Sequence, residues 1–402
     1  MIVIGGSYSE TVVYPKVVTE FMGSGLRAAS TLAADAEKFI TIAAPEEVAH
    51  IEAKLAPAVV LETLRRERPV EFRYLDPALT PTVLGVSAEP GRAHIFDCAD
   101  SDVLAFGLAE LPNGYAVKAD RIVVDPQAPR AASQQVLESM HADQIAICAN
   151  RSEARRMTGL DSPIESATAL LALPGVEAVV VKCGALGFVT ADAAGVIWSH
   201  ASPTLAVRTL GSGDVFSSVF AREWFAGESA LDAASTASSA VAASVAGETT
   251  ASPRVRLPLQ PGYAPKIYLA GPFFTLSERW LIERARATLV GLGARVFSPI
   301  HDVGPGDIEV AQKDLDGLDD CDVVFALLDG FDPGTIYETG WAARGQIPVV
   351  GFGSEQHFKE TKMLVGMGAE VHTDLTTAMY RAIWAGQGAI LTPGIHSIER
   401  DE

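Results

Sequence analysis

The sequence predicts an α/β protein of two domains, and three observations support that prediction. A length of 402 residues exceeds what one hydrophobic core normally supports. Short apolar runs alternate with helical stretches, which is typical of mostly parallel sheets covered on both faces. Residues from about 250 to 265 are rich in Pro, Gly and Thr and lack a helical period, so they are expected to form a linker.

In the first part, buried strands are expected at Ile2–Ile4, Arg121–Val124, Ala178–Val181 and Gly187–Thr190. Helices are expected at Ala131–Met140, Arg151–Thr158, Asp214–Phe225 and Ala230–Ala246. The stretch Val70–Phe106 is strand-rich and punctuated by turns, which indicates a lid or a small accessory sheet.

The second part repeats the pattern more compactly, with strands expected at Lys266–Ala270, Arg295–Ser298, Asp322–Leu328 and Pro348–Phe352. A helix capped by Ser277 should run to about Val290, and further helices are expected at Ala311–Leu318 and Thr335–Arg344. The predicted limits are residues 1–252 for the first domain, 253–265 for the linker and 266–402 for the second domain.

Composition and charge limit the classes of partner that the protein is expected to have. The formal net charge is −19, so a nucleic-acid backbone is not expected as a partner, and an anionic substrate would need local help. No uninterrupted apolar run is long enough to span a bilayer, and the start lacks the features of a signal peptide. The four cysteines have no metal-binding spacing. We therefore expect a cytoplasmic protein with reduced thiols, no membrane partner and a small-molecule substrate.

The segment Asp329–Gly340, DGFDPGTIYETG, is the most informative in the chain. It follows an apolar strand, and loops after strand carboxyl ends form the ligand site in open α/β sheets. Gly330 and Gly334 allow a sharp turn and a close approach to a ligand. Thr335 is expected to cap the next helix, which would place Glu338 in its first turn, where the dipole keeps a carboxylate ionised.

Five aspartates precede the same strand: Asp314, Asp316, Asp319, Asp320 and Asp322. On a helix, Asp314 would point toward the same strand ends as Glu338. The alternative is an ordinary solvated helix face together with an ordinary acidic residue at a helix start. Spacing alone leaves both interpretations open.

Three blocks in register favour the first interpretation. YLAGPFF at 268–274, KDLDGLDDCDVVFALLD at 313–329 and DPGTIYETGWA at 332–342 together resemble the nucleoside 2-deoxyribosyltransferase family. That family includes transferases that swap bases and hydrolases that act on nucleoside 5′-monophosphates. The resemblance implies a smaller flavodoxin-like or Rossmann-like doubly wound domain, no cofactor, and a homo-oligomer, because a neighbouring subunit commonly completes the site.

By position, Glu338 matches the family nucleophile that attacks the anomeric carbon, as in the double displacement of retaining glycosidases. Asp314 matches the family aspartate that hydrogen-bonds or protonates the departing base, and Asp332 matches an acidic residue that helps to handle the base. The resemblance further implies substrate contacts at Tyr268, Gly271, Pro272, Phe273, Gly334 and Thr335. Phe273 and Phe274 are either side chains that stack on the base or core residues. Ser277, Arg279 and the Gly334–Thr335 turn are candidates for binding a 5′-phosphate.

In the first part the clearest feature is LGSGDVF at 210–216. A glycine-rich turn opens a helix there, and its backbone N–H groups can hold an oxyanion or a phosphate. Asp214, in the first helical turn, can take a proton from a hydroxyl that attacks a γ-phosphate.

Five blocks resemble the ribokinase (PfkB-type) sugar and nucleoside kinases: IGGSYSE at 4–10, GSGLRAAS at 23–30, CANRSEARRMTG at 148–159, VKCGALGF at 181–188 and TLGSGDVFSSVF at 209–220. The resemblance implies a ribokinase-like parallel-sheet sandwich that uses ATP and Mg²⁺ if active, with Asp214 as catalytic base. It also implies an anion hole at Gly211, Ser212 and Gly213, and nucleotide or magnesium contacts at Asn150, Glu153, Lys182, Gly184 and Gly187; it predicts no metal ligand with certainty.

Three positions depart from the kinase pattern. Glu10 stands where the family has a sugar-binding aspartate, Arg27 where it has an asparagine, and Arg208 where an aspartate precedes the phosphate loop. These changes predict an altered substrate side, with Glu10 and Arg27 binding the substrate and Arg27 favouring an anionic one. Arg208 also puts the family's monovalent-cation site in doubt.

The leading hypothesis is a bifunctional enzyme of nucleoside or nucleotide metabolism. The second domain would cleave or transfer an N-glycosidic bond through a glycosyl–enzyme intermediate on Glu338, and the first would phosphorylate a sugar or nucleoside hydroxyl. The alternative is a single nucleotide N-glycosidase whose first domain is a nucleotide sensor or a dimer scaffold. A third hypothesis, a binding protein with two degenerate sites, conflicts with the intact set Asp314, Asp332 and Glu338.

Overall fold

The computed structural model describes residues 1–86, 94–111, 115–127, 139–245, 255–256, 261–306, 308–353 and 361–391. The chain forms two compact units, Met1–Ser202 with Thr209–Ser244, and Pro203–Arg208 with Val245–Glu402. The segment Pro203–Arg208 thus belongs to the second unit, although its neighbours in sequence belong to the first. The sequence alone shows no sign of this excursion.

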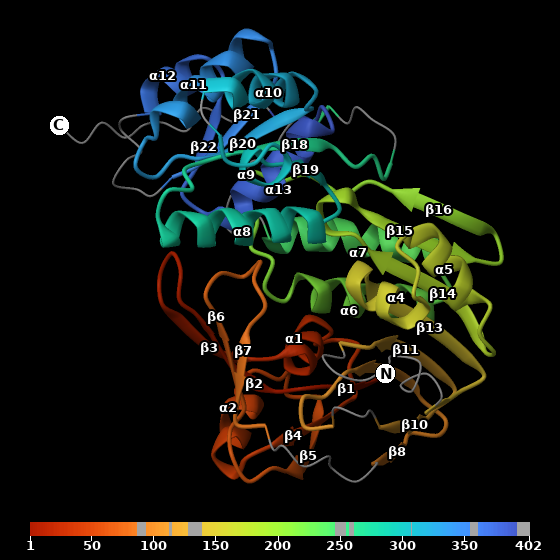
Figure 1. The fold of residues 1–402 in the computed structure, drawn as a ribbon. Coiled ribbons are helices and arrows are strands. Elements are labelled where there is room, and N and C mark those ends of the chain that lie inside the picture. Colours follow the sequence, from red (N-terminus) through yellow and green to blue (C-terminus); the bar gives the residue numbers. More distant parts are fainter. Residues whose placement is uncertain are drawn as a thin grey trace. The chain divides into compact units, whose positions relative to one another are not determined.

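A nine-stranded sheet forms the centre of the first unit (Figure 1). Its order is β16-β15-β14-β13-β11-β9-β1-β4-β5, in which the strands from β14 to β5 are parallel and β15 and β16 add an antiparallel edge. The strands are β1 (Ile2–Ile4), β4 (Lys38–Ala43), β5 (Val60–Arg65), β9 (Asp102–Phe106), β11 (Arg121–Asp125), β13 (Gln144–Asn150), β14 (Val176–Lys182), β15 (Phe188–Asp192) and β16 (Gly195–Ser199).

Helices and two smaller sheets complete the first unit. The helices are α1 (Ser24–Thr31), α2 (Val48–Glu52), α4 (Arg151–Thr158), α5 (Pro163–Leu171), α6 (Ser212–Phe225) and α7 (Ala230–Val245). An accessory sheet of order β3-β2-β6-β7 contains β2 (Tyr8–Val12), β3 (Val18–Met22), β6 (Glu71–Tyr74) and β7 (Thr82–Leu84). A further sheet joins β12 (Met140–His141), β10 (Ala116–Lys118) and β8 (Ile95–Asp97).

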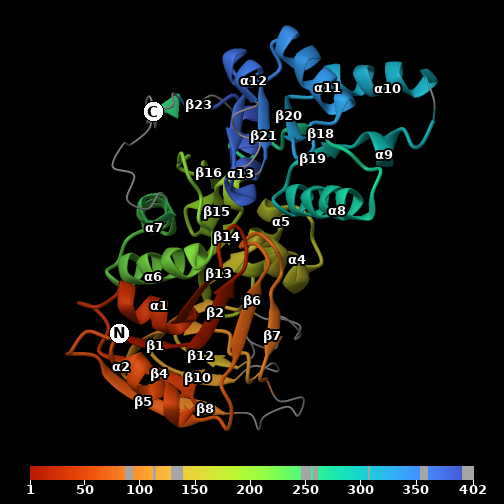
Figure 2. The ribbon, with the colours of Figure 1, turned by 90° about the vertical axis from the view of Figure 1, so that its left-hand side faces the viewer.

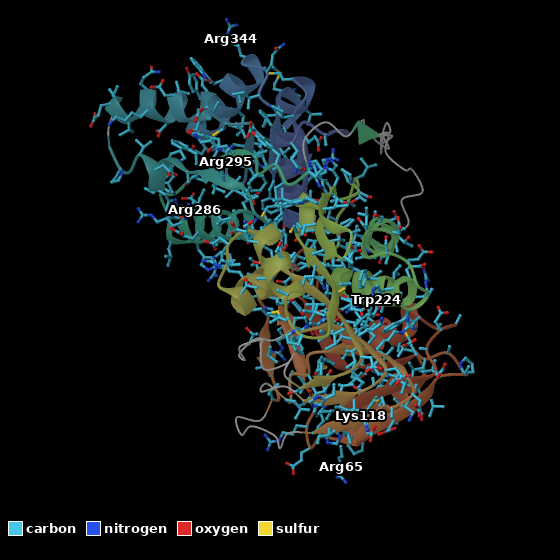
Figure 3. The ribbon with its side chains drawn as sticks, turned by 90° about the vertical axis from the view of Figure 1, so that its right-hand side faces the viewer. Arg65, Lys118, Trp224, Arg286, Arg295 and Arg344 are labelled. Atoms are coloured by element: carbon cyan, nitrogen blue, oxygen red, sulfur yellow. The ribbon has the colours of Figure 1, made fainter. Side chains whose placement is uncertain are left out.

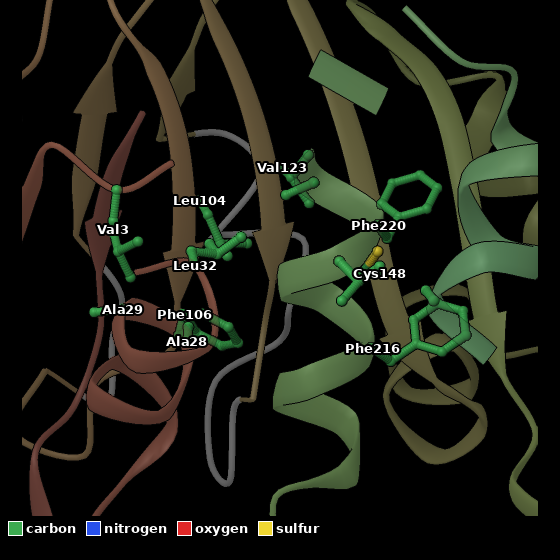
Figure 4. Close-up of a cluster of buried hydrophobic side chains, with 14 of the residues drawn as sticks. Val3, Ala28, Ala29, Leu32, Leu104, Phe106, Val123, Cys148, Phe216 and Phe220 are labelled. Atoms are coloured by element: carbon green, nitrogen blue, oxygen red, sulfur yellow. The ribbon is translucent and has the colours of Figure 1, made fainter. Parts of the chain in front are cut away.

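The core of the first unit lies between the large sheet and the helices α1 and α6. Figure 4 shows Val3, Leu104 and Val123 from the sheet gathered with Phe216 and Phe220 from α6. Burial of these apolar side chains holds the start of α6 against the strand ends. The sheet therefore fixes the position of α6.

The second unit is a five-stranded, fully parallel sheet of order β19-β18-β20-β21-β22. Its strands are β18 (Lys266–Ala270), β19 (Arg295–Phe297), β20 (Val323–Leu327), β21 (Val349–Phe352) and β22 (Glu370–His372). In chain order this is the flavodoxin-like arrangement 2-1-3-4-5, whose ligand site lies where the order reverses, between the first and third strands. That point is the carboxyl end of β18 and β20.

Helices cover both faces of this second sheet, with α8 and α13 on one side and α10 and α11 on the other (Figures 1 and 2). The helices are α8 (Leu276–Gly291), α9 (Pro299–Asp302), α10 (Ile308–Asp319), α11 (Pro333–Arg344), α12 (Lys362–Gly366) and α13 (Leu375–Gly386). Arg344, labelled in Figure 3, lies in the last turn of α11, where a cation complements the helix dipole. A short pair, β17 (Val255–Arg256) with β23 (Ile390–Leu391), stands apart from the sheet. No described helix is long and apolar enough to cross a membrane.

Two predicted helix caps are wrong by a few residues. Thr275, not Ser277, caps α8, because its Oγ1 accepts the Glu278 N–H while the Glu278 carboxylate accepts the Thr275 N–H. Asp332, not Thr335, caps α11, because its Oδ2 accepts the Thr335 N–H at 2.7 Å. The helix expected at Ala131–Met140 falls outside the described residues except for its last two, and Met140 begins the strand β12.

Candidate functional site

Three polar side chains gather at the carboxyl edge of the second sheet, at the switch point between β18 and β20. Tyr268 on β18 donates its hydroxyl to Glu338 Oε1 of α11 at 2.7 Å. Burial raises the pKa of both Tyr268 and Glu338, and the charge of Asp314, on α10, adds to both shifts. The structure therefore brings together three residues that the sequence predicted to act together.

Close packing of α10 explains how Asp314 reaches this pair. A side chain on Gly317 would lie 2.2 Å from the Phe297 ring, so the glycine allows α10 to approach β19 closely. Phe297 in turn stacks on Tyr268, with ring centroids 5.6 Å apart. Asp314 lies one turn before Gly317, on the same face of the helix. The sequence analysis missed Gly317 and Phe297, although a glycine inside a helical stretch was an available signal.

Glu338 does not lie where the sequence placed it relative to the helix start. Because α11 begins at Pro333, Glu338 falls in the second turn, and no acidic residue lies in the first. Burial raises the pKa of Glu338 to about 7, the Tyr268 hydrogen bond lowers it, and the charges of Asp314 and Asp332 raise it. Near neutral pH the carboxyl group is therefore divided between its protonated and ionised forms.

Asp314 differs from the other aspartates of its segment. Its Oδ1 is buried without a hydrogen-bond partner among the described residues, and burial raises the pKa of this carboxyl group. A group in this state can hold a proton and give it to a ligand. The other four have partners: Asp316 accepts from Gln312, Asp319 from Trp341, Asp320 from Lys266, and Asp322 from Tyr263 and the Lys266 N–H.

Asp332 and Thr335 hold the loop before Glu338 in place. The Oδ2 atom of Asp332 accepts both the N–H of Thr335 at 2.7 Å and its hydroxyl at 3.0 Å. Gly330 and Phe331 both have positive φ angles, 83° and 48°, which make the sharp turn out of β20. Gly334 is exposed, whereas Thr335 is buried, so the turn exposes backbone at Gly334 and uses Thr335 for packing.

The loop after β18 forms an aromatic edge. A Cβ on Gly271 would lie 3.0 Å from Ile282 and 3.1 Å from Leu327, so the backbone packs tightly here, and Pro272 beside it is buried. Phe273 is half-buried, whereas Phe274 is 68% exposed, with the two ring centroids 5.2 Å apart. Phe274 is therefore not a core residue, and its ring is available to a planar ligand.

The chain's own carboxylates lie at the two helix starts beside this edge. Glu278 lies in the first turn of α8, and Asp332 caps α11. Both charges oppose a bound phosphate. Arg279, which the sequence suggested as a phosphate contact, donates its Nε to the Phe273 carbonyl at 2.8 Å.

A second constellation lies in the first unit, where α6 begins. Gly211 caps the helix with a φ of 76°, and Ser212, Gly213 and Asp214 form its first turn. A Cβ on Gly211 would lie 2.2 Å from Arg27 Nε, so both its φ angle and this close approach require glycine. Both oxygens of the buried Asp214 accept hydrogen bonds, Oδ2 from Arg27 Nη1 at 2.6 Å and Oδ1 from Gln127 Nε2 at 2.7 Å.

Arg27 also joins Asp214 to Glu10, because its Nη2 donates to Glu10 Oε2 at 2.5 Å. Burial raises the pKa of both carboxyl groups, and the Arg27 guanidinium opposes that rise. Burial also raises the pKa of Tyr74 on β6, and the charges of Glu10 and Asp214 add to it. The accessory sheet therefore reaches this site, as a lid would; Gln127 and Tyr74 were not predicted.

Lys182 supplies a buried positive charge beside the same turn. Its Nζ donates to Asp125 Oδ2 at 2.6 Å and to Ser217 Oγ at 3.1 Å, and it lies 3.6 Å from the place of a Cβ on Gly213. The charges of Asp125 and Glu153 raise the pKa of Lys182 against the effect of burial, which keeps the ammonium charged. Asp125 was missed by the sequence analysis, although it ends an apolar strand.

The remaining predicted nucleotide contacts have structural partners. Asn150 and Glu153 form a capping box at the start of α4, with each side chain accepting the other's backbone N–H. Gly184 and Gly187 form the turn between β14 and β15, where a Cβ on Gly187 would lie 1.9 Å from the Ser199 carbonyl oxygen.

Within the described part of the chain, no group of three or more His, Cys, Asp or Glu side chains forms a metal-binding cluster. Mg²⁺ often takes only one or two carboxylates and completes its shell with water and substrate phosphates. Asp125 and Glu153, the carboxylates whose charges act on Lys182, already have partners, because Asp125 accepts from Lys182 Nζ and Ser217 Oγ and Glu153 accepts the Asn150 N–H.

Comparison with known families and structures adds two matches, one to each part of the chain. Residues 267–379 match the model of the nucleoside 2-deoxyribosyltransferase family, and residues 106–255 match that of the pfkB family of carbohydrate kinases. No curated protein matches the chain.

Similar solved structures are distant relatives in sequence. Ribokinase from Thermotoga maritima is 17% identical, with 61% of this chain and 93% of that chain covered and a TM-score of 0.43. The tetrameric inhibited form of phosphofructokinase-2 from Escherichia coli is 15% identical, with coverage of 61% and 93% and a TM-score of 0.44. A pyrophosphate-dependent kinase in the ribokinase family, complexed with a pyrophosphate analog and myo-inositol, is 16% identical, with coverage of 61% and 95% and a TM-score of 0.45. These likenesses are too distant to say what this chain binds.

Proposed function

Because the chain joins a pfkB carbohydrate kinase domain to a nucleoside 2-deoxyribosyltransferase domain, in that order, we propose that its C-terminal domain cleaves or exchanges the N-glycosidic bond of a nucleoside. The observation that carries the proposal is the Tyr268–Glu338 hydrogen bond beside the unpaired oxygen of Asp314. Such a site combines a carboxylate that can attack with a carboxyl group that can hold a proton.

In the proposed reaction, ionised Glu338 attacks the anomeric carbon while Tyr268 holds its Oε1. The bond from the anomeric carbon to the base nitrogen breaks, the base leaves with the proton of Asp314, and a sugar ester forms on Glu338. Water or the nitrogen of a second base then attacks the anomeric carbon and releases Glu338. The proton of that second nucleophile returns to Asp314, so the site is restored.

Charge at the site favours an uncharged sugar over a 5′-phosphate. Glu278 and Asp332 occupy the helix starts that would otherwise attract an anion, and ionised Glu338 adds to the negative field. The exposed ring of Phe274 offers a face on which a base can stack. We therefore place nucleosides before nucleoside 5′-monophosphates as substrates.

The N-terminal domain is proposed to transfer a phosphoryl group from ATP to a hydroxyl of a small sugar or nucleoside. Backbone N–H groups at Gly211–Gly213 and the Lys182 ammonium would hold the phosphates, and Asp214 would take the hydroxyl proton after Arg27 moves onto the acceptor. Bound Mg²⁺, carried by the nucleotide, would neutralise phosphate charge. The alternative, a nucleotide sensor without turnover, is favoured by the Arg27 contact with Asp214. A homo-oligomer and a cytoplasmic location stay predictions from the sequence.

The first experiment measures base release from a panel of nucleosides and their 5′-monophosphates, with and without a second free base, against Glu338→Ala. Release that disappears in the variant and favours nucleosides supports the proposal. Release from none of the substrates would remove it, and preference for monophosphates would overturn only the choice of nucleosides.

A separate measurement follows ATP consumption with a panel of sugars and nucleosides. Turnover that depends on Asp214 supports the kinase activity. Binding of ATP with no turnover of any acceptor would favour the sensor instead.

A further inference from the structure

The short segment Pro203–Arg208 is the part of the chain that leads into the glycine turn at Gly211. It nevertheless belongs to the C-terminal unit, whereas Thr209 returns to the N-terminal unit. Pro203, Thr204 and Val207 are buried, and Val207 is only 3% exposed. A surface connection between β16 and α6 would not need this burial.

One side chain of α13 holds the segment at Val207. The Thr377 hydroxyl oxygen accepts the Val207 N–H at 3.1 Å and donates to the Val207 carbonyl at 3.4 Å, and both residues are buried. Arg381, one helical turn later, points its Nη1 to the Thr204 carbonyl at 3.5 Å. Arg381 is itself fixed by Glu370 of β22, through bonds of 2.6 and 2.8 Å.

Only a short stretch of chain separates this anchor from the proposed phosphate turn. Arg208 follows Val207 and is exposed, and Thr209 then accepts the Ser212 N–H at 3.0 Å to close the turn. The Val215 N–H bonds the Gly211 carbonyl, so the turn runs directly into α6 and Asp214. Along the chain, only Arg208, Thr209 and Leu210 therefore stand between the Val207 anchor and Gly211.

We propose that Thr377, in the C-terminal domain, is a positioning residue for the Gly211–Asp214 phosphate turn of the N-terminal domain. The proposal rests on the proposed phosphoryl-transfer or nucleotide-binding role of that turn. Thr377 touches no substrate; it acts by holding Val207, and the turn follows Val207.

The test compares Thr377→Val with Thr377→Ser in the full chain. Valine has nearly the same shape as threonine but lacks the hydroxyl, whereas serine keeps it. Hydrogen–deuterium exchange of the amides from 209 to 215 should be about three- to tenfold faster in the valine variant and near wild type in the serine variant. ATP-dependent turnover should fall in the valine variant through kcat, while base release by the Glu338 site should be unchanged.

Unchanged exchange at 209–215 in Thr377→Val would overturn the proposal, and so would equally faster exchange throughout both domains. If the valine variant does not fold, Thr377→Ala removes the same oxygen with a smaller side chain and is read by the same exchange pattern. A wild-type protein that neither binds nor turns over ATP would remove the proposed N-terminal function, while the exchange comparison would still decide the role of Thr377.

Discussion

The two candidate sites hold their central carboxyl groups with different kinds of hydrogen-bond partner. Glu338 accepts one hydrogen bond, from a neutral tyrosine, and burial lifts its pKa to about 7. Asp214 accepts from a guanidinium and an amide, and the same guanidinium holds Glu10. The first site holds its carboxyl group with one neutral donor, whereas the second pairs its carboxyl group with a cation inside an ion network. Burial raises the pKa of both carboxyl groups, but only Asp214 has cations beside it that oppose the rise.

The largest effect should come from exchanging the two central residues for amides. Glu338→Gln should lower base release about 10³-fold or more because the nucleophile is lost, and should leave ATP-dependent turnover unchanged. Asp214→Asn should do the reverse, with a loss of about 10²–10⁴-fold in phosphoryl transfer. Both rates are measured on both variants. Loss of both activities in either variant would break the comparison, because the two sites would then not be separate.

Removing the Arg27 guanidinium from the Asp214 site should destabilise the protein. Arg27→Met leaves Glu10 and Asp214 buried without their counter-charge, which should cost about 3–5 kcal/mol. The matched control is Arg73→Met, which should cost little stability because solvent screens its exposed bond to Glu71. Denaturant unfolding of both variants checks this, and equal losses would show that the Arg27 network is no more than a surface pair.

Removing the Glu338 carboxyl group should stabilise the protein at alkaline pH. The pKa of Glu338 is about 7 in the folded state and near 4.5 otherwise, so the folded state favours the protonated form. This group's contribution to stability is therefore full below pH 4.5 and is lost as the pH rises through 7. Glu338→Gln should be more stable than wild type by about 1–3 kcal/mol at pH 8, with no difference at pH 4.5. Calorimetry at the two pH values checks the sign.

The smallest effect concerns the tyrosine. Base release should require ionised Glu338 and should therefore rise with pH through about 7. Tyr268→Phe removes the hydrogen bond that lowers the pKa of Glu338, so the rise should move to higher pH by about one unit. Phenylalanine keeps the stack on Phe297. A profile of kcat/KM against pH for both proteins measures the shift, and a shift to lower pH would contradict the assigned role of Tyr268.

Sequence reasoning was most successful where the signal is local. Apolar runs located β1, β11, β14, β18 and β20. The motifs named Asp214, Glu338 and Tyr268 as candidates, and the structure places Asp214 in the first turn of α6, Glu338 in the second turn of α11 and Tyr268 within β18. The caps at Thr275 and Asp332 were missed because neighbouring Ser277 and Thr335 offered equally good oxygen atoms. Only the backbone geometry distinguishes such candidates.

What the sequence did not predict depends on contacts between distant residues. The direction of the Glu338 pKa shift follows from burial, which the helix dipole argument ignored. The Arg27 network required knowing that residues 10, 27 and 214 meet. Likewise, Gly317 becomes meaningful only beside the Phe297 ring.

The bond between Val207 and Thr377 spans 170 positions along the chain. A ribosome adds about 5–20 residues each second, so Val207 is made roughly 10–30 s before its partner on α13. During that interval the newly made N-terminal domain has its glycine turn but not the hydroxyl that holds Val207. Attachment of Val207 to α13 therefore waits until that helix has been synthesised, which gives the emerging chain a natural order of maturation.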